Sequence, residues 1–304
     1  MRSSRPSPPH RAPRRRLRRL ALSAAGVVAL LAAIVVAGGS CMSFTMEPEK
    51  VSAFFASRPH PPTFHTDRVE GRPVHWVEVG DRALPTVLFV HGSPGSWSAF
   101  LGFLGDAELA ARAHLVAVDR PGFGGSDRGR AEAPLVRQTA ALVPALTAAP
   151  AGLPAILVGH SLGAPIVAQL AVDHPAAVGG LVLVAPSIDP ALEIHRWYNV
   201  LASWRLVEWL LPRDLVTSNR ELWPLKAELE GFLPRWREIR VPVTVVQGED
   251  DDLVDPANAG FAARVLVGTQ VEVRRIPGVG HLIPWERPDL IRQAVLDQLA
   301  RRQG

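Results

Sequence analysis

A serine between two glycines is the residue of this chain best placed to act as a nucleophile. Ser161 lies in Gly159-His160-Ser161-Leu162-Gly163, directly after an apolar run that predicts a strand and before a helical run over Pro165–Asp173. A sharp strand-to-helix turn exposes the hydroxyl and aims the free N–H groups of the helix at the same point. The flanking glycines remove side-chain bulk for which such a turn has no room. The pattern predicts a nucleophile, and its alternative is an ordinary turn carrying a small polar residue.

Polar residues also follow three other predicted strands. Ser93 comes after the apolar run Thr86–Val90, an acidic run over 248–252 comes after Val243–Val246, and His281 comes after Val271–Ile276. In open α/β sheets, sites form outside the carboxyl ends of the strands. We therefore expect these segments to converge on Ser161.

The spacing of strands and helices predicts the elements that must position these residues. Predicted strands alternate with predicted helices along the chain, which indicates a mostly parallel α/β sheet with helices on both faces. Residues 187–240 interrupt the alternation with a helical pattern and hold five of the eight tryptophans. We interpret this segment as an inserted helical cap. A cap this small cannot bury all five rings within itself, so we expect the remainder to face the Ser161 pocket.

The order serine, acid, histidine resembles that of the α/β-hydrolase superfamily. The resemblance runs from about Pro73 to Arg301 and rests on five motifs taken together, where any one alone would be weak. It is most similar to the cap-bearing esterase, lipase and peptidase branch, since resembling epoxide hydrolases and dehalogenases have aspartate where this chain has Ser161. The motifs are His91-Gly92-Ser93-Pro94, Asp119-Arg120-Pro121-Gly122-Phe123-Gly124-Gly125-Ser126, Gly159-His160-Ser161-Leu162-Gly163, Gly248-x-x-Asp251 and Gly280-His281.

The resemblance implies a role for each residue. His281 would take the Ser161 proton as general base, and Asp251 would orient His281 and stabilise its charged form. The backbone N–H groups of Ser93 and Leu162 would form an oxyanion hole. Family spacing selects Asp251, but the neighbouring carboxylates Asp250, Asp252 and Asp255 remain alternatives for the acid.

Composition excludes several other classes of protein. The chain has 304 residues and a formal net charge of +4, but eight of its 33 basic residues and none of its 29 acidic ones lie in residues 1–40. The remainder is therefore mildly acidic, which argues against nucleic-acid binding. The single cysteine excludes internal disulfides and cysteine-rich metal sites. Asp127 replaces the third glycine of a dinucleotide-binding pattern, so no cofactor or metal is expected.

The N-terminus predicts attachment to a membrane. Eight arginines precede Leu20–Gly39, which carries no charge and is about one membrane crossing long. Three interpretations stay open: an uncleaved signal anchor, a lipoprotein signal ending at Cys41, or a cleaved secretory signal. Each places the catalytic body outside the cytoplasm. The expected organisation is a leader over 1–40, a proline-rich stalk over 41–64, and a hydrolase domain over 65–304.

Taken together, the sequence predicts a serine hydrolase that cleaves carboxylic esters of a small, largely apolar substrate through an acyl-enzyme intermediate. The same residues would also permit an amide or thioester hydrolase or an acyltransferase. A catalytically silent hydrolase fold used for binding is a further alternative. The sequence does not determine the oligomeric state.

Overall fold

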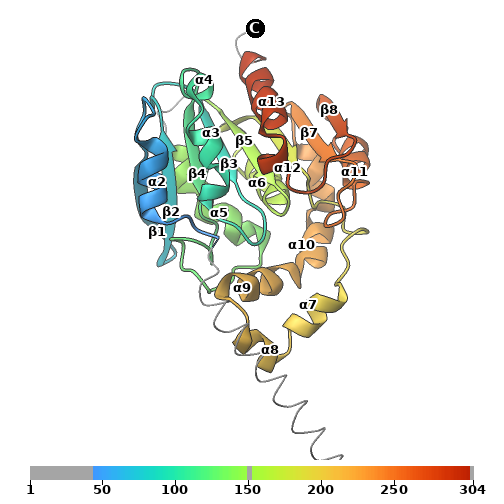
Figure 1. The fold of residues 1–304 in the computed structure, drawn as a ribbon. Helices are drawn as coiled ribbons and strands as arrows, with labels where there is room; N and C mark the ends of the chain where they lie inside the picture. The colour runs from blue at the N-terminus through green and yellow to red at the C-terminus, as the bar shows by residue number, and fades with distance from the viewer. Residues whose placement is uncertain (1–43, 149–152, 302–304) are drawn as a thin grey trace, which may run out of the picture.

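An eight-stranded sheet forms the centre of the protein in a computed structural model that describes residues 44–148 and 153–301 (Figure 1). Its strand order is β1-β2-β4-β3-β5-β6-β7-β8. Strands β3 to β8 run parallel, and β2 is antiparallel to both of its neighbours. The predicted mostly parallel α/β sheet is confirmed. The strands are β1 (Thr63–Val69), β2 (Arg72–Val79), β3 (Thr86–Val90), β4 (His114–Val118), β5 (Ala155–His160), β6 (Val178–Val184), β7 (Val243–Gly248) and β8 (Val271–Ile276).

The central strands are buried on both faces because helices cover each side of the sheet. Every residue of β3 and β5 is buried, as their uninterrupted apolar runs require. One face packs against α5, α6, α10, η2 and α11, and the other against α2, α3, α4, α12 and α13. The helices outside the cap are α2 (Pro48–Phe55), η1 (Trp97–Phe100), α3 (Leu101–Leu104), α4 (Ala107–Ala110), α5 (Leu135–Thr147), α6 (Gly163–Asp173), α11 (Asn258–Val265), α12 (Ile283–Glu286) and α13 (Pro288–Ala300).

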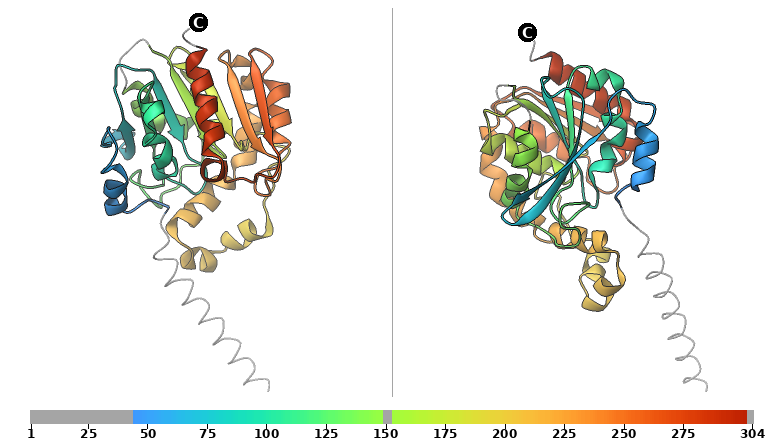
Figure 2. Two further views of the ribbon diagram at one scale, coloured as in Figure 1. Left: turned by 45° about the horizontal axis from the view of Figure 1, so that its top comes forward. Right: turned by 90° about the vertical axis from the view of Figure 1, so that its left-hand side faces the viewer.

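The predicted helical insertion over 187–240 divides into two parts with different surroundings. Helices α7, α8 and α9 project beyond the carboxyl ends of the strands (Figure 2). Helix α10 and η2 instead join the core, where Leu229, Phe232 and Trp236 are buried. The projecting cap is therefore smaller than the insertion. The helices of the insertion are α7 (Trp197–Ala202), α8 (Arg205–Leu210), α9 (Arg213–Leu222), α10 (Leu225–Phe232) and η2 (Leu233–Glu238).

The prediction of a stalk over 41–64 is wrong for most of these residues. Val51 and Phe55 of α2 are buried in the hydrophobic cluster on one face of the sheet. Strand β1 begins at Thr63 and pairs with β2 along its whole length. Because β1 is an edge strand with mostly exposed side chains, its sequence lacks the alternation of apolar and polar residues that predicts a strand. The proline-rich residues between these elements form a connection within the domain rather than a spacer.

No helix within residues 44–148 and 153–301 is both long and apolar enough to cross a membrane. The predicted membrane segment Leu20–Gly39 lies outside the described residues.

Candidate active site

Ser161 occupies the tight turn that the sequence predicts between β5 and α6. Its backbone φ is +54°, in the left-handed region that non-glycine residues seldom adopt. A Cβ atom added to Gly159 would lie 2.5 Å from the Gly163 carbonyl oxygen. One added to Gly163 would lie 2.3 Å from the carbonyl oxygen of Val90 on β3. The turn therefore has no room for a side chain at either glycine, and the strained backbone holds Ser161 at the end of the strand.

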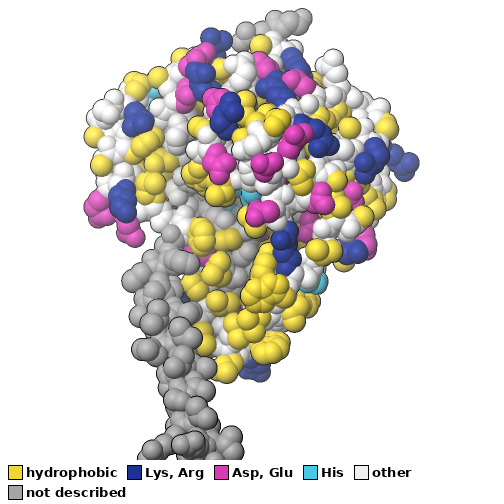
Figure 3. All heavy atoms as spheres, turned by 45° about the vertical axis from the view of Figure 1, so that its right-hand side comes forward, with side chains coloured by type: hydrophobic (Ala, Val, Ile, Leu, Met, Phe, Trp, Pro, Cys, Tyr) yellow, Lys and Arg dark blue, Asp and Glu magenta, His cyan; other side chains and the backbone are white. Residues whose placement is uncertain are grey.

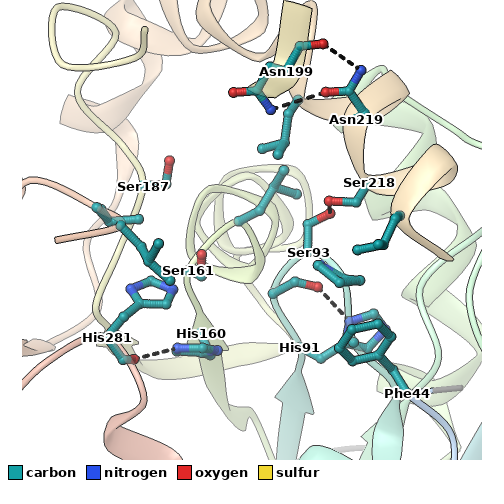
Figure 4. Close-up of a pocket in the computed structure, with 18 of the residues that line it drawn as sticks. Phe44, His91, Ser93, His160, Ser161, Ser187, Asn199, Ser218, Asn219 and His281 are labelled. Atoms are coloured by element: carbon teal, nitrogen blue, oxygen red, sulfur yellow. Dashed lines mark hydrogen bonds between the residues drawn. The ribbon is translucent and has the colours of Figure 1, made fainter. Parts of the chain in front are cut away.

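His281 and Asp251 are hydrogen-bonded to each other beside this turn. Asp251 follows β7 and His281 follows β8, and His281 Nδ1 lies 2.8 Å from Asp251 Oδ2. The other carboxylate oxygen accepts the backbone N–H groups of Leu253 at 3.0 Å and Val254 at 2.8 Å. With the Nδ1 proton on the side of the carboxylate, the imidazole Nε2 is left as the basic nitrogen. Figure 4 shows the ring and the Ser161 hydroxyl next to one another at the pocket.

The Asp251 carboxylate is held in its ionised form. Burial acts to raise its pKa, but the hydrogen bond and charge of His281 and the backbone N–H groups of Val254 and Leu253 outweigh burial and lower the pKa. The competing side chains of Asp250, Asp252 and Asp255 are all exposed. Of the four predicted candidates for the acid, the structure brings Asp251 to the histidine.

The residues predicted to supply an oxyanion hole flank the same turn. Leu162 immediately precedes α6, where backbone N–H groups have no partner within the helix. Ser93 follows β3, whose Val90 lies opposite Gly159 of β5 in the parallel register. A Cβ atom added to Gly92 would lie 2.8 Å from the Ser161 Cβ, so the Ser93 loop and the serine turn are in direct contact. Ser93, Leu162 and Ser161 all line one pocket.

A pocket of about 1890 Å³ lies between these strand ends and the cap. Its base contains Ser161 and His281 (Figure 4), and the cap contributes apolar side chains together with polar ones that include Asn199, Ser218 and Asn219. This volume exceeds the roughly 300–1,000 Å³ that is usual for small-molecule sites. The apolar lining residues contributed by the cap and the segment before it are Leu192, Ile194, Trp197, Leu201, Val207, Leu211, Leu215 and Leu222.

Comparison with known proteins identifies the family. Residues 87–294 match the family model described as the alpha/beta hydrolase family. The chain belongs to this family. The expected resemblance is thereby confirmed, and the matched region contains the Ser93 loop, Ser161, Asp251 and His281.

Individual relatives of this alpha/beta hydrolase are distant. The chain is 28% identical over 250 residues to a Mycobacterium tuberculosis protein named "Putative non-heme bromoperoxidase BpoC", covering 69% of this chain and 92% of that protein. It is similar to the structure of a membrane phospholipase A, with a TM-score of 0.62 and 22% identity, covering 93% of this chain and 97% of the other. Its similarity to the carboxylesterase CesB from Bacillus subtilis has a TM-score of 0.62 and 20% identity, covering 83% and 96%. At these identities the solved structures support the fold alone.

His160, next to the serine of this hydrolase, supports the backbone of His281. Its Nε2 lies 3.1 Å from the His281 carbonyl oxygen, and the two rings have centroids 4.8 Å apart. Burial, reinforced by the neighbouring charge of His281, lowers the pKa of His160 to about 3. His160 is therefore neutral at physiological pH and donates to the His281 carbonyl.

Three hydrogen bonds that hold the hydrolase site together have no local signal in the sequence. The Ser93 hydroxyl donates to the Ser218 hydroxyl of α9 at 2.8 Å, which ties the predicted oxyanion loop to the cap. Arg120 donates through Nε to the His91 carbonyl at 2.9 Å and through Nη2 to the Gly92 carbonyl at 2.8 Å. A fully buried arginine needs hydrogen-bond partners. Only the fold shows that the partners of Arg120 include the carbonyl groups of this loop.

Most of the cap tryptophans that are not buried do not line the pocket, contrary to the expectation for this remainder. Trp236 is buried in the core, and among the other four only Trp197 lines the pocket. Trp204, Trp209 and Trp223 are exposed and are not among the residues that line the pocket. The expectation fails for Trp204 and Trp209 because α7 and α8 are short helices at the tip of the cap and contain no buried residue.

The described residues contain no group of three or more His, Cys, Asp or Glu side chains arranged to hold a metal ion.

Proposed function

We propose that this protein is a serine hydrolase that cleaves carboxylic ester bonds, with Ser161 as nucleophile, His281 as general base and Asp251 as the orienting acid. The observation that carries the proposal is the 2.8 Å hydrogen bond between His281 Nδ1 and Asp251 Oδ2 beside a serine in a strained turn. A serine hydroxyl is a weak nucleophile until an adjacent base removes its proton, and this arrangement supplies that base with a fixed tautomer.

The reaction would proceed in two halves. The Ser161 Oγ attacks the ester carbonyl carbon as its proton passes to His281 Nε2, giving a tetrahedral oxyanion. The carbon–oxygen bond to the leaving alcohol then breaks, and His281 returns the proton to that alcohol, which leaves an acyl-serine. Water attacks this intermediate with His281 again as base, and collapse releases the carboxylic acid and regenerates Ser161.

The backbone N–H groups of Leu162 and Ser93 would stabilise the oxyanion. Both line the pocket at the serine turn, and the start of α6 adds the positive end of a helix. Loss of one such donor typically costs about 3 kcal/mol of transition-state stabilisation. The contacts that Arg120 and Ser218 make to the Ser93 loop would keep these donors in place.

The preferred substrates are esters with an extended apolar group. Apolar cap side chains line a pocket larger than a short acyl group needs. Among the cap arginines, Arg196 lines the pocket, and its Nη2 donates to the backbone carbonyl of Asp252 at 2.7 Å. Arg205, Arg213 and Arg220 line a separate hollow. Because Arg196 already donates to a backbone carbonyl and the other three arginines line a different hollow, the pocket favours a neutral acyl group over a carboxylate.

Labelling with a fluorophosphonate probe tests the nucleophile. We expect the wild-type protein to be labelled and Ser161→Ala to lose labelling. Ser187→Ala is the matched control, because Ser187 lines the same pocket with its hydroxyl bonded to Glu193. Labelling that survives in Ser161→Ala and disappears in Ser187→Ala would reject the proposal. A panel of esters, thioesters and amides with a common acyl group would then establish the bond that is cleaved.

We also propose that the N-terminal segment holds this hydrolase at a membrane with the catalytic domain outside the cytoplasm. The support is the eight arginines that precede the uncharged Leu20–Gly39. The native protein should fractionate with membranes and be accessible to protease on spheroplasts. Cys41→Ala separates the alternatives, since processing of a lipoprotein would be lost and a signal anchor would be unaffected. Recovery of the native protein in the cytosol would contradict this topology.

A further inference from the structure

The outer side of the cap carries an unusual concentration of exposed apolar side chains. Neither α7 nor α8 contains a buried residue. Trp204 is 62% exposed, Leu206 73% and Trp209 77%. Figure 3 shows hydrophobic side chains gathered over the cap at the lower end of the molecule. Contiguous exposed apolar surface of this kind marks an interaction site. We call this set the cap-tip patch, and its members are Ile194, Trp197, Val200, Trp204, Leu206 and Trp209.

A cationic hollow of about 610 Å³ adjoins the cap-tip patch. Trp209 lines it together with Glu208 and five arginines. Glu208 pairs with Arg220, Asp214 with Arg128, and Asp127 with Arg130. Five guanidinium groups against three carboxylates leave the hollow positive, although the chain outside residues 1–40 is acidic overall. The five arginines are Arg128, Arg130, Arg205, Arg213 and Arg220.

The start of the described chain lies against the same end of the molecule. The Phe44 N–H donates to the Asp214 carboxylate of α9 at 3.5 Å, and the Phe44 carbonyl accepts from Ser96 at 2.7 Å. Phe44 is five positions after Gly39, the end of the predicted membrane segment. Fully extended, five residues reach at most about 18 Å. A bilayer that contained Leu20–Gly39 would therefore lie close to the cap.

We propose that the cap-tip patch docks into the surface of an anionic phospholipid bilayer, with the arginines of the adjoining hollow on the lipid headgroups. Tryptophan is the residue that favours the boundary between headgroups and acyl chains, and cationic side chains beside it attract anionic lipid. A two-fold contact with a second copy would place these arginines against their own copies, which like charge disfavours. The proposal concerns a surface distinct from the Ser161 site and does not depend on the reaction assigned to that site.

Docking would place the pocket at the membrane. Trp197 belongs to the cap-tip patch and also lines the Ser161 pocket, so one side chain joins the two surfaces. An amphiphilic substrate would then reach the pocket from the bilayer without crossing water.

A fluorophore placed on the cap tests the contact in the full-length protein. The chain has one cysteine, so Cys41→Ser provides the background for Leu206→Cys labelled with an environment-sensitive dye. The matched control is Val267→Cys, which is 77% exposed against 73% for Leu206 but located before β8, at the opposite ends of the strands from the cap. Both proteins are reconstituted with vesicles of phosphatidylcholine alone or mixed with phosphatidylglycerol, and binding is measured by flotation.

Docking predicts blue-shifted emission and quenching by shallow doxyl-labelled phospholipids for the Leu206→Cys label, and neither for the Val267→Cys label. Doxyl groups at shallow positions should quench the label more strongly than doxyl groups at deep positions, because interfacial insertion reaches roughly 5–10 Å. Adding Arg205→Gln and Arg213→Gln should weaken docking on phosphatidylglycerol vesicles by about fivefold per arginine.

Three outcomes would overturn the proposal. Protein that floats with an unquenched Leu206→Cys label would exclude the cap contact while leaving the N-terminal anchor intact. A blue shift without doxyl quenching would show that a second copy covers the patch. Failure of the Cys41→Ser background protein to float would reject the cap contact, and failure of the protein with Cys41 intact to float would reject the anchor as well.

Discussion

Arg120 and Glu221 form a fully buried ion pair that joins the sheet to the cap. Arg120 Nη2 lies 2.7 Å from Glu221 Oε1, and Nη1 lies 2.9 Å from Oε2. Both side chains are completely inaccessible to solvent. The same guanidinium donates to the carbonyls of His91 and Gly92, just before Ser93. One side chain therefore fixes the cap helix α9 and the predicted oxyanion loop relative to each other.

Glu221→Gln is expected to destabilise the protein strongly. Removing one partner of a buried ion pair leaves an uncompensated charge, which typically costs about 3–5 kcal/mol. Urea unfolding measures the loss. The matched control is Glu208→Gln, which breaks the more exposed pair with Arg220 and should cost no more than about 1 kcal/mol. Equal losses of unfolding free energy in the two variants would show that the buried pair contributes no more to stability than the exposed pair.

Asp251→Asn is expected to lower turnover by about 10⁴-fold, by analogy with the acid of serine proteases. The amide cannot hold His281 in the tautomer that leaves Nε2 basic. Steady-state kinetics with a neutral ester measures the effect. Asp250→Asn and Asp252→Asn are the controls, because both side chains are exposed, and each should keep near-normal turnover. A larger loss in either control would reassign the acid.

His160 should make the protein less stable below neutral pH. Its pKa in the folded protein is about 3, against about 6.5 for an unperturbed histidine. Between these values the unfolded chain binds a proton that the folded protein excludes, so the free energy of unfolding falls by about 1.4 kcal/mol per pH unit of acidification. From pH 7 to pH 5 the contribution of His160 is a loss of roughly 2 kcal/mol.

Replacing His160 isolates this contribution. His160→Gln retains a donor for the His281 carbonyl but cannot titrate, so its unfolding free energy should change less between pH 7 and pH 5. The pKa of His91 is also lowered, chiefly by burial and by Arg120 with a smaller contribution from His160, so most of the His91 contribution is common to both proteins and cancels in the comparison. The prediction fails if the two pH dependences coincide.

Specificity should rise with the length of a neutral acyl chain. Each methylene buried in the pocket contributes at most about 0.8 kcal/mol, or roughly fourfold in kcat/KM, until the pocket is full. The large apolar pocket predicts that the plateau comes with long rather than short chains. Acidic analogues of equal length are the comparison. If they were preferred, Lys50 or Lys226, which line the pocket with exposed side chains, would become the candidates for a carboxylate contact.

Local patterns in the sequence were sufficient to predict the framework of this protein. Strands β3 and β8 have the predicted bounds because each is a short apolar or alternating run between turns. The serine turn was equally evident, since Gly159 and Gly163 are required by contacts within a few residues or with the adjacent strand. The positions of Ser161, Asp251 and His281 after predicted parallel strands predicted their convergence, because parallel strands bring their carboxyl ends to one edge.

Contacts between residues far apart in the chain were decided by the tertiary structure. Family spacing selected Asp251 and left its neighbours Asp250 and Asp252 as alternatives, and the hydrogen bond to His281, thirty residues away, distinguishes Asp251 in the structure. Helix α2 and strand β1 follow from packing on a sheet whose partners come later in the chain. The division of the cap tryptophans into core, pocket and exposed side chains has the same cause. The period of a short helix shows that it has an apolar side, but whether another element covers that side depends on how the whole chain folds.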